Sequence, residues 1–306
     1  MNDELLSRIA ETLFWMGRYV ERADDTARLV DAYVHRLPGA RADCGSLFAI
    51  LGVDPRDDEP DAGTALLRLA YDRHDPSAIS GAILAARTGA RGIREVISSE
   101  MWECLNVTAL ALPGQRRAAD RLGPDVFLRY VRERTALFSG LADATMSHDH
   151  AWRFLVLGRS LERADMTARL LQARQRLPAE LGWPVVLRAC GAYESFVRTH
   201  AGSLPRADEF LLLDRLFPRS VLHSLVIVEE CLVALNPGPV RAGVDDPARR
   251  PIGRLRTTLE YTEAARLAGQ LPELLPALQE ACVEASEAIT RRYFQYEEAV
   301  AWERAR

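Results

Sequence analysis

Residues 17–29 read Gly17-Arg18-Tyr19-Val20-Glu21-Arg22-Ala23-Asp24-Asp25-Thr26-Ala27-Arg28-Leu29, and this segment predicts much of the architecture. Apolar residues recur through it at alternating spacings of three and four, which places them on one stripe of a helix. They are Leu13, Met16, Val20, Ala23, Ala27, Val30 and Val34. No proline occurs from Met1 to Leu37, so we expect one helix of roughly 30 residues that ends at Pro38-Gly39.

The same segment returns 141 residues later as Gly158-Arg159-Ser160-Leu161-Glu162-Arg163-Ala164-Asp165-Met166-Thr167-Ala168-Arg169-Leu170, with ten of the thirteen positions identical. Both copies lead into an Arg-Leu-Pro triplet, at 36–38 and 176–178. A repeat of this kind indicates an internal duplication. We therefore expect two halves, 1–146 and 147–306, packed as one compact bundle with a pseudo-two-fold axis.

The rest of the chain also has a helical period, and strand-type alternation is nearly absent, so the fold class expected is all-α. Further helices are expected near 64–72, 77–111, 124–146, 148–177, 183–202, 217–235, 251–268 and 272–303. Loops are expected where proline and glycine accumulate, at 38–63, 113–124 and 236–253.

Composition excludes several classes of protein. The chain has 39 basic and 43 acidic residues for a net charge of −4, so no overall basic field attracts nucleic acid. All the basic residues are arginine, which excludes a P-loop lysine and a pyridoxal Schiff base. The five cysteines form no CxxC pair, and no apolar run reaches the length of about 18 residues that a membrane helix needs. We expect a cytoplasmic protein that neither spans nor binds a membrane.

The charges of the first segment are repeated in the second, which a solvated helix face would not require. Arg18, Glu21, Arg22, Asp24 and Arg28 return as Arg159, Glu162, Arg163, Asp165 and Arg169. Asp25 is replaced by Met166, so we interpret Asp25 as lying on the outermost face. Two interpretations of the repeated charges stay open. They form a buried ion-pair network that fixes the helices, or their guanidinium groups bind a carboxylate or phosphate.

Other candidate site residues carry weaker signals. His148 is a candidate general acid or base, and Glu100 is a second one. Trp102 and Trp152 are candidate contacts for a substrate or partner, although both fit an ordinary bundle helix. His148 and His150 are two residues apart, which is poor spacing for metal ligands. Glu-x-x-His, HExxH, GxSxG and GxGxxG are absent, so we expect neither a metal nor a cofactor.

These residues resemble the bacterial alpha-E family, and the resemblance spans nearly the whole chain. The matching segments are residues 6–23, 97–103, 146–148 with Trp152, 162–169, 210–214 and 217–221. This chain departs from the family pattern at His150 and at Ala151, where glycine is usual. The resemblance implies an all-helical protein whose gene neighbours, or is fused to, a circularly permuted ATP-grasp ligase, often with a transglutaminase-like protein. It also implies a setting of ATP-dependent amide-bond formation that makes or attaches a small peptide.

Three functions follow as hypotheses. In the first, the chain is a non-ATPase accessory partner of the ATP-grasp ligase and helps to hold an acidic or peptidic substrate. In the second, it is itself a transferase or ligase subunit in which His148 or Glu100 is the base and Arg22 and Arg163 clamp an anion. In the third, it is a scaffold only. Self-association into a homo-oligomer is a further expectation that each hypothesis allows.

Overall fold

The computed structural model describes residues 7–34, 44–51, 62–174, 182–200, 206–237 and 246–294. These residues form α-helices and connecting turns, with no strand among them, so the all-α fold class is confirmed. The helices are α1 (Ser7–Val34), α2 (Cys44–Leu51), α3 (Ala62–Tyr71), α4 (Ile79–Arg91), α5 (Ser99–Leu122), α6 (Asp125–Thr145), α7 (His150–Arg174), α8 (Gly182–Ala189), α9 (Tyr193–His200), α10 (Ala207–Leu213), α11 (Val221–Leu235), α12 (Arg249–Glu260) and α13 (Ala264–Tyr293).

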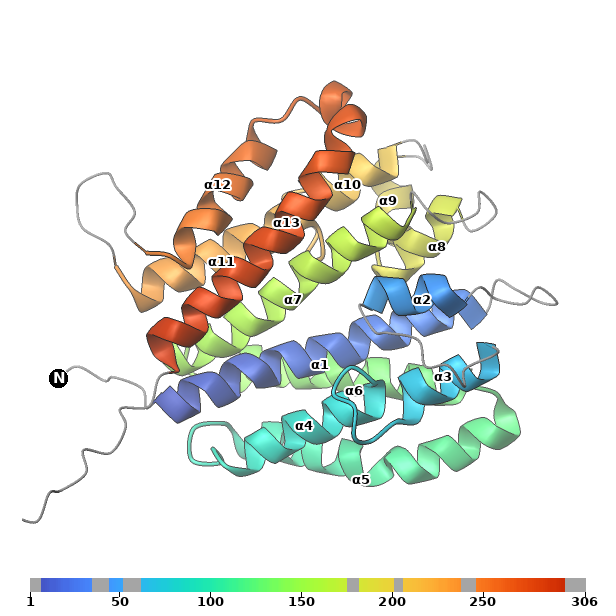
Figure 1. Cartoon of the computed structure of the whole chain (residues 1–306). Helices are drawn as coiled ribbons and strands as arrows, with labels where there is room; N and C mark the ends of the chain where they lie inside the picture. The colour runs from blue at the N-terminus through green and yellow to red at the C-terminus, as the bar shows by residue number, and fades with distance from the viewer. Residues whose placement is uncertain are drawn as a thin grey trace, which may run out of the picture.

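The two long helices that carry the repeated segment, α1 and α7, pack against each other through the middle of the molecule (Figure 1). Helices α4 and α6 cover α1 on one side, with α5 outside them. Helices α11 and α13 cover α7 on the other side, with α12 against both. The repeated segment therefore lies at the centre of the bundle. The division into duplicated halves at residue 146 stays a prediction.

Two glycines let α1 and α7 come into backbone contact. A Cβ atom on Gly17 would overlap the carbonyl oxygen of Leu155, and a Cβ atom on Gly158 would overlap the carbonyl oxygen of Phe14. Phe14 and Leu155 occupy the same position in the two copies, as do Gly17 and Gly158. The crossing is therefore reciprocal: each copy offers a glycine to the backbone of the other.

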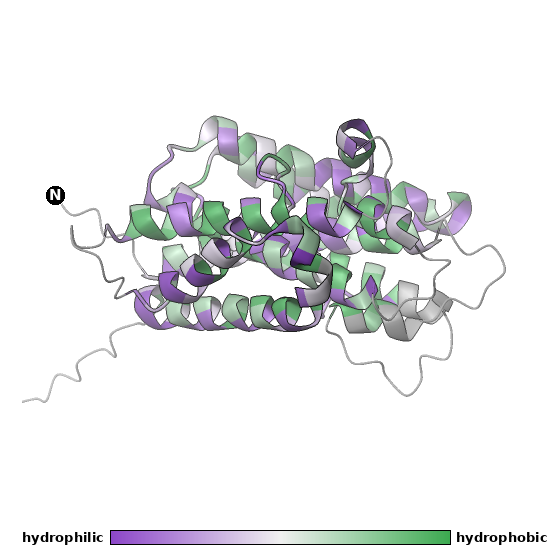
Figure 2. Ribbon diagram, turned by 90° about the horizontal axis from the view of Figure 1, so that it is seen from above, coloured by the Kyte–Doolittle hydropathy of each residue, from purple (hydrophilic) through white to green (hydrophobic). Residues whose placement is uncertain are grey.

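The apolar stripe predicted for the first segment lies in the core, together with the stripe of the second. Leu13, Ala23 and Ala27 are completely buried, as are Leu161 and Ala164. Figure 2 shows apolar and polar residues alternating along the helices, as expected for helices with one buried face. Helices of this kind are held mainly by burial of their apolar faces.

Several predicted helix boundaries are wrong. The stretch expected as one helix over 77–111 is two helices, because the chain turns at 92–98 and Ser98 begins α5 by accepting a hydrogen bond from the Met101 amide at 3.3 Å. The expected loop 113–124 is largely helix, because α5 continues through Pro113. Pro113 is exposed to solvent, so its ring lies outside the core, and the helix loses one backbone hydrogen bond there.

Other boundaries differ for similar local reasons. Helix α2 lies inside the expected loop 38–63, and the expected helix 183–202 is divided into α8 and α9 by a turn at 190–192. The expected helix 251–268 ends at Glu260, and α13 begins at Ala264. Within the described ranges, none of the helices combines the length and apolar character that crossing a bilayer requires.

Candidate functional site

Glu162 of α7 is the centre of the first charged cluster. Its carboxylate accepts hydrogen bonds from the Nε atoms of Arg18 and Arg22 of α1, each at 2.6 Å. The Glu162 side chain is 4% exposed. Burial by itself would raise the pKa of Glu162, but the charges and hydrogen bonds of the two arginines outweigh it and lower the pKa to about 2. Glu162 is therefore an anion held between two guanidinium groups.

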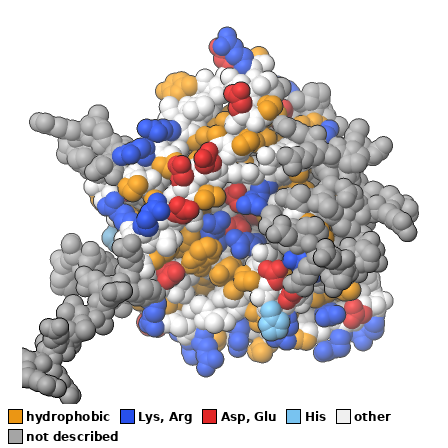
Figure 3. All heavy atoms as spheres, viewed as in Figure 1, with side chains coloured by type: hydrophobic (Ala, Val, Ile, Leu, Met, Phe, Trp, Pro, Cys, Tyr) orange, Lys and Arg blue, Asp and Glu red, His pale blue; other side chains and the backbone are white. Residues whose placement is uncertain are grey.

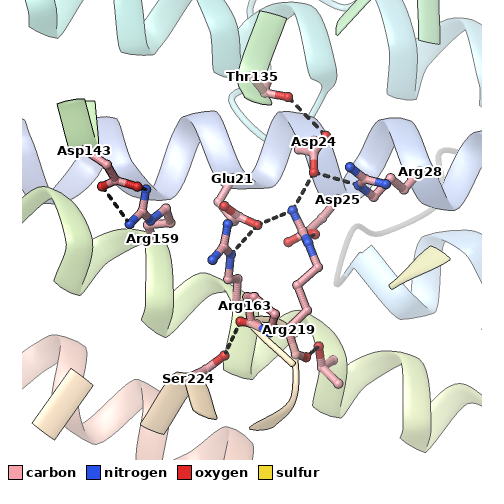
Figure 4. A network of polar contacts seen from close by, with 12 residues as sticks. Glu21, Asp24, Asp25, Arg28, Thr135, Asp143, Arg159, Arg163, Arg219 and Ser224 are labelled. Carbon is pink, nitrogen blue, oxygen red and sulfur yellow. Dashed lines mark hydrogen bonds and ion pairs between the residues drawn. The ribbon is translucent and has the colours of Figure 1, made fainter. Parts of the chain in front are cut away.

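Glu21 of α1 is the centre of the second cluster. It accepts a hydrogen bond from Nε of Arg163 of α7 at 2.8 Å and an ion pair from Arg219 at 2.6 Å. Arg219 lies in the turn between α10 and α11 and points toward α1, as Figure 4 shows. Its guanidinium also binds Asp24 and Asp25. One arginine from the second half of the chain thus contacts three carboxylates of α1.

The two Glu-Arg pairs exchange partners across the α1–α7 crossing. Arg22 of α1 binds Glu162 of α7, and Arg163 of α7 binds Glu21 of α1. This exchange follows from the backbone contact at the two glycines, because the residues one helical turn further along each helix then face the partner helix. The repeated Glu-Arg pairs are therefore bound to each other. The alternative that they also bind a ligand stays a prediction.

Asp24 and Asp25 lie beside the Glu21 cluster but differ in their surroundings. Asp24 accepts hydrogen bonds from Arg28 at 2.7 Å and from Thr135 of α6 at 3.0 Å. Burial would raise the pKa of Asp24, yet the charges of Arg219 and Arg28 outweigh it, and the pKa is lowered. The pKa of Asp25 is well above its ordinary value because of burial, against which the Arg219 charge acts in the other direction.

The prediction that Asp25 lies on the outermost face is wrong. Asp25 is 4% exposed, and one of its oxygens, Oδ2, is buried without a hydrogen-bond partner. The replacement of Asp25 by Met166 does not indicate an exposed position, because methionine is commonly buried. Met166 is itself buried, so the position faces the interior in both copies.

The second copy repeats part of this arrangement. Asp165 accepts a hydrogen bond from Arg169 at 3.0 Å, as Asp24 does from Arg28. Burial raises the pKa of Asp165 despite the charge of Arg169. Arg159, the counterpart of Arg18, does not reach Glu21 but pairs with the exposed Asp143 at 3.3 Å. Arg219 supplies the second guanidinium group that the Glu21 cluster would otherwise lack.

Three acidic side chains are close enough together to be considered as metal ligands. One oxygen each of Glu21, Asp24 and Asp25 lies within 4.8 Å of the others. The guanidinium of Arg219 binds all three carboxylates and already supplies the positive charge that a cation would bring. A metal ion would have to displace this arginine.

The weaker candidates lie apart from the clusters. His148 is exposed, stacks on Trp152 with ring centroids 3.9 Å apart, and has Nε2 3.2 Å from the Asp143 carbonyl oxygen. Glu100 is exposed at the start of α5, where a backbone hydrogen bond lowers its pKa. Among the described contacts, none joins His148 or Glu100 to the arginine clusters.

Trp102 also lies away from both clusters. The guanidinium groups of Arg87 and Arg94 lie over its ring, the second at 5.2 Å from the centroid. The ring therefore carries cation–π contacts on α5, and its role as a contact for a substrate or partner stays a prediction.

Arg219 is the main site residue that sequence reasoning missed. Its charge is not part of the repeat, and it lies 49 positions after Leu170, the last residue of the second copy. The available signal was its position in the segment 217–221, which matches the alpha-E pattern.

Comparison with known proteins agrees with this geometry. A family profile described as a predicted alpha-helical domain with a conserved ER motif matches residues 5–294. Uncharacterized proteins from Mycobacterium bovis and Mycobacterium tuberculosis are 26% identical over 324 residues, which cover 92% of this chain and 36% of theirs. No solved structure is significantly similar. The paired Glu21-Arg22 and Glu162-Arg163 fit an ER motif, and the chain belongs to the Alpha-E family.

Proposed function

We propose that this chain is a non-ATPase accessory partner of a circularly permuted ATP-grasp ligase that forms amide bonds in peptide synthesis or peptide tagging. The alpha-E resemblance implies such a ligase, and often a transglutaminase-like protein, as neighbours. In this proposal the ligase handles ATP, and the Alpha-E chain docks on it and helps to hold an acidic or peptidic substrate.

The observation that carries the proposal is the length of the relatives. The matched region makes up 36% of the mycobacterial proteins. In those proteins the Alpha-E region is therefore joined to a longer polypeptide, as expected for a domain that acts together with a partner.

The geometry of the charged clusters supports an accessory role. Arg22 and Arg163 are each bound to a glutamate of the opposite helix, and removal of one partner of a buried ion pair leaves an uncompensated charge. Their first role is therefore to join α1 to α7. This leaves the outer helix faces for docking.

One outer face has the apolar character that docking requires. Val107 and Leu110 lie one turn apart on α5 and are 53% and 67% exposed, and Leu137 of the neighbouring α6 is 43% exposed. Exposed apolar side chains grouped on one face often mark a protein interface. We assign this face to the ligase.

The test is co-expression with the ATP-grasp protein encoded beside this chain, followed by gel filtration and an assay of amide formation. We expect one peak, and we expect Leu110→Glu to separate the two proteins. Leu216→Glu is the matched control, because Leu216 is 87% exposed in the α10–α11 turn and lies outside the proposed face. Separate elution at micromolar concentration, with ligase turnover unchanged by this chain, would contradict the proposal.

The alternative of an independent transferase or ligase gives a different result for Arg22→Ala. If Arg22 clamps an anion, the variant loses turnover by the isolated chain and keeps its melting temperature. If Arg22 joins the helices, the melting temperature falls. A scaffold would neither bind a substrate nor change ligase turnover.

A further inference from the structure

A basic hollow lies between α11 and α12, away from the paired Glu-Arg helices. It has a volume of about 730 Å³. Glu229 of α11 lines one side, and four arginines of α12 line the other: Arg249, Arg250, Arg254 and Arg256. Figure 3 shows basic side chains over α12 at the upper left of the face in view. This concentration of guanidinium groups contrasts with the net charge of −4 of the whole chain.

Glu229 holds two of these arginines in fixed positions. Its Oε1 accepts a hydrogen bond from Nε of Arg249 at 3.1 Å, and its Oε2 accepts one from Nε of Arg256 at 2.5 Å. The Glu229 side chain is 15% exposed. Because both bonds use Nε, Arg249 keeps its terminal N–H groups for other acceptors, whereas Arg256 gives Nη1 to Glu260 and keeps Nη2. Side chains fixed in advance lose less conformational entropy when a ligand binds.

Gly253 allows the Glu229 carboxylate to lie against the backbone of α12. A Cβ atom on Gly253 would be 3.2 Å from Oε1 of Glu229, so alanine there would push the carboxylate away. Gly253 stands between Arg249 and Arg256, which are two helical turns apart on the same side of α12. The glycine, the glutamate and the two arginines thus form one positioned unit.

The charges in the hollow are not balanced. Glu229 binds Arg249 and Arg256, and Glu260 binds Arg256 as well. Arg254 is exposed and makes no ion pair with another described residue. The guanidinium group of Arg254 therefore keeps a positive charge that an anionic ligand would neutralise.

We propose that this hollow binds a small ligand that carries two or more phosphate charges. Guanidinium groups bind phosphate through paired hydrogen bonds. A phosphate group presents three oxygens and up to two negative charges, whereas a carboxylate presents two oxygens and one charge. The site is separate from the ligase-docking face on α5 and α6, and it does not depend on the proposed partnership.

Isothermal titration of the full chain with inorganic pyrophosphate tests this proposal. We expect binding that weakens as salt is added. Arg254→Gln should weaken binding about tenfold, because a charge-assisted hydrogen bond is lost. Gly253→Ala should also weaken it by displacing Glu229. Arg121→Gln is the matched control: it removes one arginine from the last turn of α5 and should leave the affinity unchanged.

Three outcomes would overturn the proposal. The first is no pyrophosphate binding tighter than about 1 mM at low salt. The second is an equal loss of affinity in Arg254→Gln and Arg121→Gln, which would mean a non-specific charge effect. The third is tighter binding of triglutamate than of pyrophosphate, which would make the ligand a carboxylate. Thermal melting of each variant separates loss of binding from loss of the fold.

Discussion

The two copies of the Glu-Arg segment use almost the same residues but obtain their partners differently. Around Glu162, both guanidinium groups come from α1. Around Glu21, one comes from α7 and the other from Arg219, in the turn before α11. Asp25, present in the first copy alone, adds a third carboxylate for Arg219. Both copies therefore keep the Glu-Arg pair that joins α1 to α7. The charges around that pair differ, because Arg219 and Asp25 are present beside the first copy alone.

The largest difference between the clusters should be seen in Arg219→Ala. This variant leaves Glu21, Asp24 and Asp25 without the guanidinium that they share, and we expect a loss of about 3–5 kcal/mol in the free energy of unfolding. Chemical denaturation measures it. Arg215→Ala in the same turn is the control, because Arg215 is 63% exposed and should change stability by less than about 1 kcal/mol. Similar losses in both variants would show that Arg219 is not the shared partner.

The Glu162 cluster should dominate the acid sensitivity of the fold. The folded pKa of Glu162 is lowered from 4.5 to about 2, so the unfolded chain takes up this proton first as the pH falls. The stabilisation is complete above pH 4.5 and is lost as the pH decreases toward 2, by roughly 3 kcal/mol. Glu162→Gln should remove this part of the pH dependence in unfolding measured between pH 5 and 2. An unchanged slope would contradict the ion-pair geometry.

The glycine crossing should give equal effects in the two copies. Gly17→Ala and Gly158→Ala each place a methyl group against a backbone carbonyl of the other helix, and we expect each to cost about 1–3 kcal/mol. Gly140→Ala on α6 is the control. A Cβ atom there meets nothing within 4 Å, so it should stabilise the protein by about 0.5–1 kcal/mol. A clear difference between the first two variants in melting temperature would show that the crossing is not reciprocal.

The smallest effect is expected for Asp25→Asn. The raised pKa of Asp25 means that the folded protein binds this proton more tightly than the unfolded chain. Its contribution to stability is present below the unfolded pKa of 3.8 and is lost as the pH rises through the folded pKa, opposite in sign to Glu162. Asparagine should flatten that slope, and we expect it to cost less stability than Arg219→Ala, because Oδ2 of Asp25 has no hydrogen-bond partner to lose. A loss as large as that of Arg219→Ala would mean that Asp25, rather than Glu21 or Asp24, is the main partner of Arg219.

The sequence was sufficient to predict the long helices, but it was not sufficient to predict all the side-chain contacts between them. The periodic stripe and the missing prolines were enough for α1 and α7, because a helix is encoded by residues close together in the chain. The repeat also showed which charges matter. It could not show that Arg219 binds the first copy, because a turn is brought to a helix by tertiary packing, which leaves no periodic signal. Pro113 marked a boundary in the pattern, yet α5 continues through it, with the proline ring on the exposed side of the helix.

The position of Arg219 has a consequence for fragments of this protein. A cut between α6 and α7 would separate Glu21, Asp24 and Asp25 from both Arg163 and Arg219, leaving Arg28 as the remaining arginine of the cluster. Three carboxylates of α1 would then have one arginine beside them, Arg28, which pairs with Asp24. The face of α1 that packs against α7 would also be exposed to solvent. We therefore expect that the N-terminal fragment does not fold by itself. On heating, the intact chain should unfold in a single cooperative transition that includes the residues on both sides of the cut.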